Sequence, residues 1–201
     1  MRLLRRGVTL TVLLAFGAVG GCGSHTRASD PASAFEGLAI QPPKPAPALT
    51  LRNYTGKPVD LSTLRGKAVL VTFVYTHCPD VCPLMVSKLA AAERQLGPEA
   101  RHLQIVAVTV DPKNDTRRAV TQFLAARGAT GRMDYLVGTV AQLVPVWKAW
   151  DIEVIVNKKG DTQSHSALVL GIASSGKIVV VYPSNFTPAQ IVHDVPLLAH
   201  S

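Results

Sequence analysis

The run at residues 68–75 (AVLVTFVY) constrains the fold more than any other stretch of the chain. It is apolar and rich in β-branched residues, and it lacks the polar–apolar alternation of a strand with one face in water. A strand of this kind is buried on both faces, as in a parallel sheet covered by helices. A second such run, residues 102–110, follows a helical segment at residues 79–96. This alternation predicts the α/β class.

The other segments continue the pattern. A β-hairpin is predicted at residues 49–60, ahead of the first buried strand. After the second buried strand we expect helices at residues 116–127, at residues 140–150 and after Thr187, and strands at residues 134–137, 167–172 and 178–181. This order predicts a thioredoxin-like fold with an N-terminal β-hairpin and an insertion, mainly because a cysteine pair stands at the first junction between a buried strand and a helix.

The first residues have the pattern of a targeting signal. The basic start MRLLRR precedes a short apolar run and small residues, which predicts a signal peptide over residues 1–21. The apolar run is shorter than the ~20 residues that a membrane-spanning helix needs. Val19-Gly20-Gly21-Cys22 resembles a bacterial lipobox, in which Cys22 would become the lipidated first residue. The alternative is an ordinary signal peptide with an incidental cysteine.

Residues 22–48 are rich in Pro, Ala and Ser, which predicts an extended tether. A single domain at residues 49–201 would then be held at the cell membrane by a lipid anchor, facing the extracytoplasmic side. The formal net charge is +8, but the predicted signal contributes three of the arginines. No basic cluster is interleaved with aromatic residues, so we expect no nucleic-acid partner.

The three cysteines are Cys22, Cys78 and Cys82. One close pair and one cysteine at the cleavage site do not make a disulfide scaffold, so the pair is free for chemistry. We expect Cys78 at the start of a helix, where exposed N–H groups and the dipole stabilise a thiolate. In a regular helix the two Cα atoms would lie about 6 Å apart, which permits either a disulfide or a shared metal ion.

The spacing favours a metal ion over a redox disulfide. Dithiol oxidoreductases of this fold have two residues between their cysteines, whereas three separate Cys78 from Cys82. These enzymes also have a cis-proline just before the strand that corresponds to residues 167–172 of this chain. Here residues 160–166 contain no proline, and His165 stands at the strand entry. Two thiolates and one imidazole suit Cu(I), whereas zinc would require a fourth ligand.

Three motifs now point to a family. The run YTHCPDVCP at residues 75–83, the Val110-Asp111-Pro112 motif with Asp115-Thr116, and the lone His165 before a strand closely resemble the signature of the Sco (SenC) family. The resemblance spans residues 49–197. It implies a membrane-tethered, thioredoxin-like copper protein with Cys78, Cys82 and His165 as ligands of Cu(I) or Cu(II). The family often has Asp directly before its histidine, where this chain has Ser164; Asp161 is a possible substitute.

The resemblance implies a metallochaperone rather than a turnover enzyme. Its recipient would be the dinuclear copper site of cytochrome c oxidase subunit II, or another cuproprotein. The alternative is an extracytoplasmic thiol–disulfide oxidoreductase that uses Cys78 and Cys82 to keep a partner's cysteines reduced. A peroxidase of the same fold needs Pro and Thr or Ser seven and three residues before its cysteine, where this chain has Val71 and Tyr75.

Simpler roles are expected for the neighbouring residues. His77 is interpreted as a surface or supporting residue. Asp80 is interpreted as an acid that favours the helix dipole, and the alternative is a role in positioning a partner or tuning the thiols. Asp111-Pro112 is expected to end a strand, and Asp115-Thr116 to cap the helix that follows. Met85 is expected in the core rather than at the metal.

Overall fold

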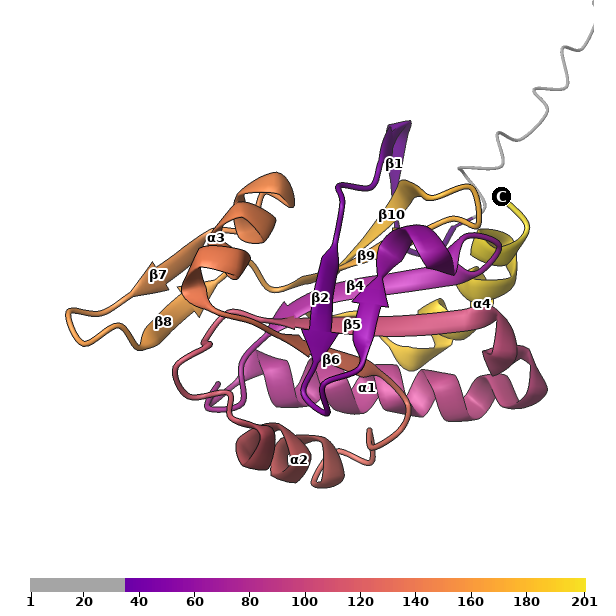
Figure 1. Ribbon diagram of the computed structural model, residues 1–201. Helices are drawn as coiled ribbons and strands as arrows, with labels where there is room; N and C mark the ends of the chain where they lie inside the picture. The colour runs from indigo at the N-terminus through magenta and orange to yellow at the C-terminus, as the bar shows by residue number, and fades with distance from the viewer. Residues whose placement is uncertain (1–34) are drawn as a thin grey trace, which may run out of the picture.

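The computed structural model describes residues 35–201 of the chain. In this part of the chain the main sheet has eight strands, in the order β1-β10-β9-β4-β5-β6-β2-β3 (Figure 1). The strands are β1 (Leu38–Pro45), β2 (Thr50–Asn53), β3 (Pro58–Asp60), β4 (Ala68–Val74), β5 (Leu103–Thr109), β6 (Asp134–Val137), β9 (Leu168–Ile172) and β10 (Lys177–Pro183). Strands β4, β5 and β6 are parallel, and β9 pairs antiparallel with β4.

Within residues 35–201, four α-helices and a separate hairpin complete the fold. The helices are α1 (Val81–Leu96), α2 (Arg117–Ala125), α3 (Val140–Ala149) and α4 (Pro188–Ala199), with 3-10 segments η2 (Leu61–Leu64) and η3 (Gly97–His102). Strands β7 (Val154–Val156) and β8 (Thr162–His165) form the hairpin. Figure 1 shows this hairpin and α3 together at one end of the molecule, with α4 and the C-terminus at the other. The predicted α/β class and N-terminal hairpin β2–β3 are confirmed.

The core follows the predicted burial. All seven residues of β4 are buried, as expected for a central strand without polar alternation. Met85 on α1 is fully buried in the core, as predicted. Thr187 accepts a hydrogen bond from the backbone N–H of Gln190, and Pro188 follows it at the start of α4. Most elements therefore lie where the sequence predicts them, because helix caps and buried strands have local sequence signals.

The predicted tether is wrong for its last residues. Leu38–Pro45 form β1, which pairs antiparallel with β10 at the edge of the sheet. An edge strand has one side without ladder partners, so it tolerates prolines that a central strand would not. The folded domain therefore begins earlier than residue 49. The predicted signal peptide, Cys22 and the first part of the tether lie outside the described residues.

Asp194 on α4 binds the segment that precedes the edge strand β1. Its carboxylate is fully buried and accepts hydrogen bonds from the backbone N–H groups of Glu36 and Gly37, each at 2.9 Å. The Tyr182 hydroxyl donates a further bond at 2.9 Å. These contacts join the chain before β1 to α4 and β10. Within residues 35–201, no helix is both long enough and apolar enough to cross a membrane.

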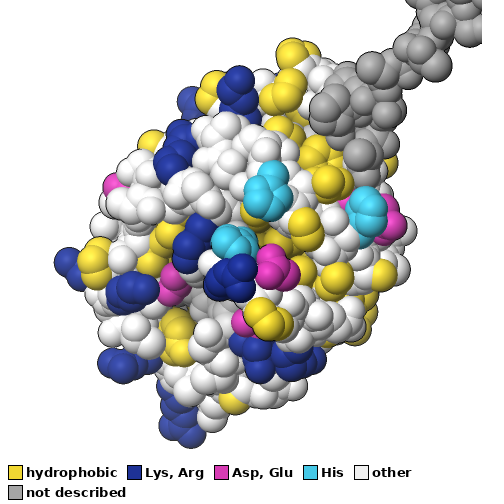
Figure 2. Space-filling model, turned by 90° about the vertical axis from the view of Figure 1, so that its right-hand side faces the viewer, with side chains coloured by type: hydrophobic (Ala, Val, Ile, Leu, Met, Phe, Trp, Pro, Cys, Tyr) yellow, Lys and Arg dark blue, Asp and Glu magenta, His cyan; other side chains and the backbone are white. Residues whose placement is uncertain are grey.

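The end of the molecule that carries α4 is remote from hairpin β7–β8. Figure 2 shows this end, with exposed histidines and with Lys and Arg side chains spread among few acidic ones. His193 on α4 and His200 after it are both exposed. Their position at this end separates them from the cysteines, which follow the opposite end of β4.

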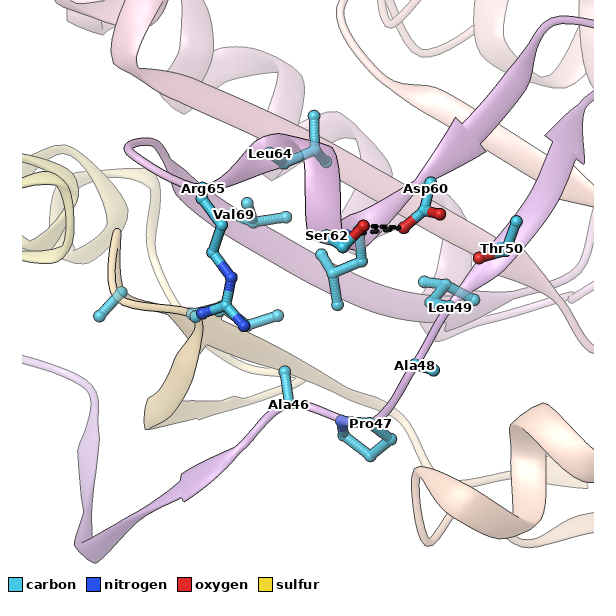
Figure 3. Close-up of a pocket in the computed structure, with 14 residues that line it drawn as sticks. Ala46, Pro47, Ala48, Leu49, Thr50, Asp60, Ser62, Leu64, Arg65 and Val69 are labelled. Atoms are coloured by element: carbon cyan, nitrogen blue, oxygen red, sulfur yellow. Dashed lines mark hydrogen bonds between the residues drawn. The ribbon is translucent and has the colours of Figure 1, made fainter.

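A pocket of about 360 Å³ lies beside the segment between β1 and β2. Figure 3 shows Arg65 reaching across the pocket and Asp60 accepting from Ser62. The Arg65 guanidinium donates to the carbonyl oxygen of Ser175. Val69, near the start of β4, also lines the pocket. Because the cysteines follow the other end of β4, this pocket is not part of their site.

Candidate metal centre

The loop that carries the cysteines follows the carboxyl end of β4. Helix α1 begins at Val81, so the predicted helix start at Pro79 is wrong and Cys78 lies in the loop. The reason is Pro83, whose ring would clash with the carbonyl of residue 79 if the helix began there. With the helix starting at Val81, Pro83 occupies the first turn, where no backbone N–H is needed.

The Cys78 sulfur nevertheless contacts the helix N-terminus. Asp80 is the N-cap residue, yet within the described chain its side chain makes no capping hydrogen bond. The Cys82 backbone N–H instead donates to Cys78 Sγ at 3.4 Å. An N–H group of the first helical turn, which has no partner within the helix, thus contacts the Cys78 sulfur. This contact can stabilise a Cys78 thiolate even though Cys78 lies in the loop.

His165 meets the pair from the end of β8. Its Nε2 lies 3.3 Å from Cys82 Sγ, and its Nδ1 lies 2.9 Å from the carbonyl oxygen of Ser166. Because a carbonyl only accepts hydrogen bonds, Nδ1 carries a proton, and the Nε2 of the neutral ring presents its lone pair to the sulfur. The Tyr75 ring packs edge-on against the imidazole, with centroids 5.6 Å apart. The ring is therefore oriented with its ligand nitrogen toward the thiols.

The electrostatics separate the two cysteines. A hydrogen bond from the Cys82 thiol lowers the pKa of Cys78 to about 5, against the opposing effect of partial burial. The same bond, followed by burial, raises the pKa of Cys82. Burial lowers the pKa of His165. At neutral pH the site therefore holds one thiolate, one thiol and one neutral imidazole.

The donor set fits a soft cation. Both cysteines are free thiols, Cys82 is fully buried and Cys78 is half-buried. Cys82 contacts Cys78 through its backbone N–H and His165 through its sulfur, but within residues 35–201 no three His, Cys, Asp or Glu side chains are already gathered as a metal cluster. Binding one ion with all three would therefore draw the side chains closer together. Two sulfurs and an imidazole nitrogen are ligands that Cu(I) prefers.

Asp115 has a role that sequence reasoning missed. Thr116 caps α2 as expected, with its hydroxyl accepting from the Ala119 backbone N–H. Asp115 is buried and accepts bonds from the Thr76 backbone N–H at 2.8 Å and the Thr76 hydroxyl at 2.7 Å. The Tyr135 hydroxyl donates to it at 2.6 Å. Asp115 therefore holds the loop two residues before Cys78. The available signal was its position after β5, because neighbouring parallel strands end at one edge.

The remaining predictions near the site have mixed outcomes. His77 is exposed and lies 3.1 Å, Nδ1 to Oγ1, from Thr76, which agrees with a supporting role. Asp161 does not contact His165, since its carboxylate accepts from Lys113 and Asn157 instead. The group that orients His165 is the Ser166 carbonyl, which no side-chain pattern could indicate.

Comparison with known proteins adds the family. A family model described as SCO1/SenC matches residues 40–200, most of the chain. The chain belongs to the SCO1/SenC family. The SCO1 protein homolog of Bacillus subtilis is 27% identical over 136 residues, covering 66% of this chain and 70% of that protein. Protein SenC of Rhodobacter capsulatus is 32% identical over 149 residues, covering 73% of this chain and 66% of that protein.

Solved structures share the fold of this SCO1/SenC protein. Bradyrhizobium japonicum ScoI with copper bound superposes with a TM-score of 0.67 at 27% identity, covering 76% of this chain and 98% of that one. BsSco, a member of the Sco family of cytochrome c oxidase assembly proteins, gives a TM-score of 0.66 at 24% identity, covering 81% and 98%. The thioredoxin-like architecture predicted from the sequence is thus confirmed as that of Sco structures.

Proposed function

We propose that this SCO1/SenC protein is a copper metallochaperone that binds one copper ion through Cys78, Cys82 and His165. The observation that carries the proposal is the 3.3 Å contact between Cys82 Sγ and a His165 Nε2 whose lone pair faces the sulfur. The copper bound to Bradyrhizobium ScoI supports the choice of ion. The recipient would be the dinuclear copper site of cytochrome c oxidase, on subunit II, or another cuproprotein.

Each side chain has a distinct part in this proposal. Cys78 is half-buried and its pKa is lowered, so it offers an accessible thiolate for the first contact with the ion. Cys82 is buried and must lose its proton to become a ligand, so loading releases a proton. His165 is neutral and ready to bind. Release to a partner would occur by ligand exchange at the accessible side of Cys78.

An anaerobic Cu(I) titration of the reduced chain tests this proposal. We expect one ion per wild-type chain and weaker binding by His165→Ala, because a site with two thiolates alone lacks its nitrogen ligand. His77→Ala is the matched control, since His77 is adjacent to Cys78 but its ring contacts Thr76 rather than the thiols. Unchanged affinity in His165→Ala would remove that residue from the site.

A second candidate function is thiol–disulfide exchange, in which the pair keeps a partner's cysteines reduced. The lowered pKa of the half-buried Cys78 beside a buried Cys82 favours it. The Cys78 thiolate would attack a partner's disulfide and Cys82 would resolve the mixed disulfide, which leaves the partner reduced and the pair oxidised. We expect alkylation of Cys78 to stay fast down to about pH 5, since the thiolate is lost only as pH falls through its pKa. Mass spectrometry of iodoacetamide-treated peptides measures this. Alkylation that rises only near pH 8.5, the ordinary thiol range, would contradict it.

For localisation, we propose an extracytoplasmic domain anchored to the cell membrane by a lipid on Cys22. The support is the signal-like sequence that ends in Val19-Gly20-Gly21-Cys22. Such an anchor would restrict the copper site to partners at the same membrane.

A further inference from the structure

Hairpin β7–β8 carries His165 but stands apart from the main sheet. Among the described strands, β7 and β8 pair only with each other, with Val154 opposite His165. An isolated two-stranded hairpin is at best marginally stable in water. The position of His165 relative to the cysteines therefore depends on what attaches this hairpin to the domain.

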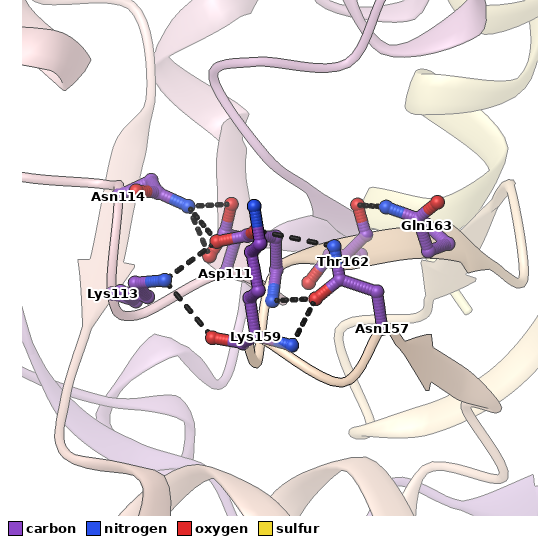
Figure 4. Close-up of polar contacts among 8 residues, drawn as sticks. Asp111, Lys113, Asn114, Asn157, Lys159, Thr162 and Gln163 are labelled. Carbon is purple, nitrogen blue, oxygen red and sulfur yellow. Dashed lines mark hydrogen bonds and ion pairs between the residues drawn. The ribbon is translucent and has the colours of Figure 1, made fainter.

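An ion pair attaches the start of β8 to the loop after β5. Lys113 Nζ lies 2.7 Å from Asp161 Oδ1 and also donates to the carbonyl oxygen of Lys159 at 3.0 Å (Figure 4). The other carboxylate oxygen of Asp161 accepts from Asn157 Nδ2 at 3.1 Å, across the hairpin turn. Lys113 thus contacts the hairpin turn at two points, the Lys159 carbonyl and the Asp161 carboxylate. Asp161 in turn bonds to Asn157 at the other end of the turn.

Two further contacts fix the same junction. The Thr162 hydroxyl, which is buried, donates to the Val110 carbonyl at 2.6 Å. Asn114 Nδ2 donates to both oxygens of the buried Asp111, at 2.9 and 3.1 Å, and reaches Asp161 Oδ1 at 3.5 Å. Several polar groups of the loop between β5 and α2 therefore form hydrogen bonds with the hairpin.

The same loop is bound to the cysteine segment. Asp115 accepts from the Thr76 backbone N–H and hydroxyl, two residues before Cys78. The loop at residues 110–116 thus connects both halves of the metal centre: Asp115 holds the segment before the thiols, and Lys113 holds the hairpin that bears the imidazole.

We propose that Lys113 and Asp161 are positioning residues that keep His165 Nε2 within reach of the cysteine sulfurs. Asp161 lies four residues before His165, about 13 Å along an extended strand, so it acts through the strand rather than on the ring. The inference deepens the proposed copper function and rests on it. The pair is substantially exposed, so we expect little loss of global stability when it is removed. Its effect should be on the geometry of the site.

Copper binding by Lys113→Met tests this role. We expect copper affinity to fall about tenfold, the lower end for groups that hold a metal ligand in place. With Cu(II), the electron paramagnetic resonance spectrum should lose part of its nitrogen hyperfine signal as the imidazole leaves. Lys113→Arg, which keeps a donor for Asp161, should restore affinity. Lys158→Met is the matched control, because its side chain makes no hydrogen bond or ion pair with the described residues.

Hydrogen exchange in the copper-free protein provides a second readout. Amides of β8 should exchange faster in Lys113→Met than in the wild type or Lys158→Met, because the attachment of the hairpin is weakened. If Lys113→Met equals Lys158→Met in affinity, spectrum and exchange, the inference is overturned. If His165→Ala leaves copper affinity unchanged, the proposed ligand set fails, while the exchange rates still decide whether Lys113 holds the hairpin.

Discussion

Cys78→Ser and Cys82→Ser should each abolish copper uptake at concentrations that give one ion per wild-type chain. A serine hydroxyl is a hard oxygen that keeps its proton near neutral pH, so it does not replace a soft thiolate toward Cu(I). Cys82→Ser also removes the sulfur that contacts His165 Nε2 at 3.3 Å. Metal analysis after gel filtration under reducing conditions measures the stoichiometry.

The control for these variants lies on α1, the helix that carries Cys82. Met85→Leu replaces a fully buried thioether on α1 with an aliphatic side chain of similar volume. We expect copper binding to be retained, since Met85 is part of the core. Thermal melts of all three variants should show folded protein. A folded Cys78→Ser chain with one tightly bound copper ion would exclude Cys78 as a ligand.

Much of the fold was predictable because its signals are local. The apolar run that became β4 specifies a central strand by itself, and Thr187 with Pro188 specifies a helix start. The two cysteines were recognisable from their position after that strand. Each of these features depends on residues that are close together in the chain, so the pattern is visible in a single sequence.

The features that were mispredicted depend on distant contacts. The prolines of β1 are typical of an extended tether. The segment is a strand because it pairs with β10 at the edge of the sheet, and that contact is not visible in the local sequence. The turn of hairpin β7–β8 depends on Asp161, which accepts from Asn157 within the turn and from Lys113, more than forty residues earlier. Side-chain hydrogen bonds across such separations leave no periodic pattern. The sequence therefore indicated the candidate ligands of the site, but not the contacts that hold them in place.

Asp115→Ala is expected to lower the free energy of unfolding by about 3 kcal/mol or more. The substitution leaves the Thr76 N–H and the hydroxyls of Thr109 and Tyr135 without their acceptor, and each unsatisfied buried group costs about 1–3 kcal/mol. Urea denaturation of the copper-free chain measures the change. Asp80→Ala is the control in the cysteine loop, because Asp80 is exposed and its side chain makes no capping bond to the described residues. We expect its effect to stay within about 0.5 kcal/mol.

The pH dependence of the Asp115 effect has a defined sign. Burial raises the pKa of Asp115, with the hydrogen bonds from Thr109, Tyr135 and Thr76 opposing it. A folded-state pKa above the unfolded one means that the native chain binds this proton more tightly. The stabilisation from that proton is full below the unfolded pKa and is lost as pH rises through the folded pKa. Asp115→Asn, which cannot ionise, should lack this contribution to the pH profile.

Copper binding by Asp115→Ala links stability to the site. If Asp115 holds the loop before Cys78, copper affinity should fall even at temperatures where the variant is fully folded, because Thr76 is freed two residues from a ligand. A variant that loses stability but keeps wild-type affinity would make Asp115 a core residue only. The comparison with Lys113→Met then separates the two attachments. Asp115→Ala should lower both global stability and copper affinity, whereas Lys113→Met should change copper affinity and the exchange of β8 amides with little loss of global stability.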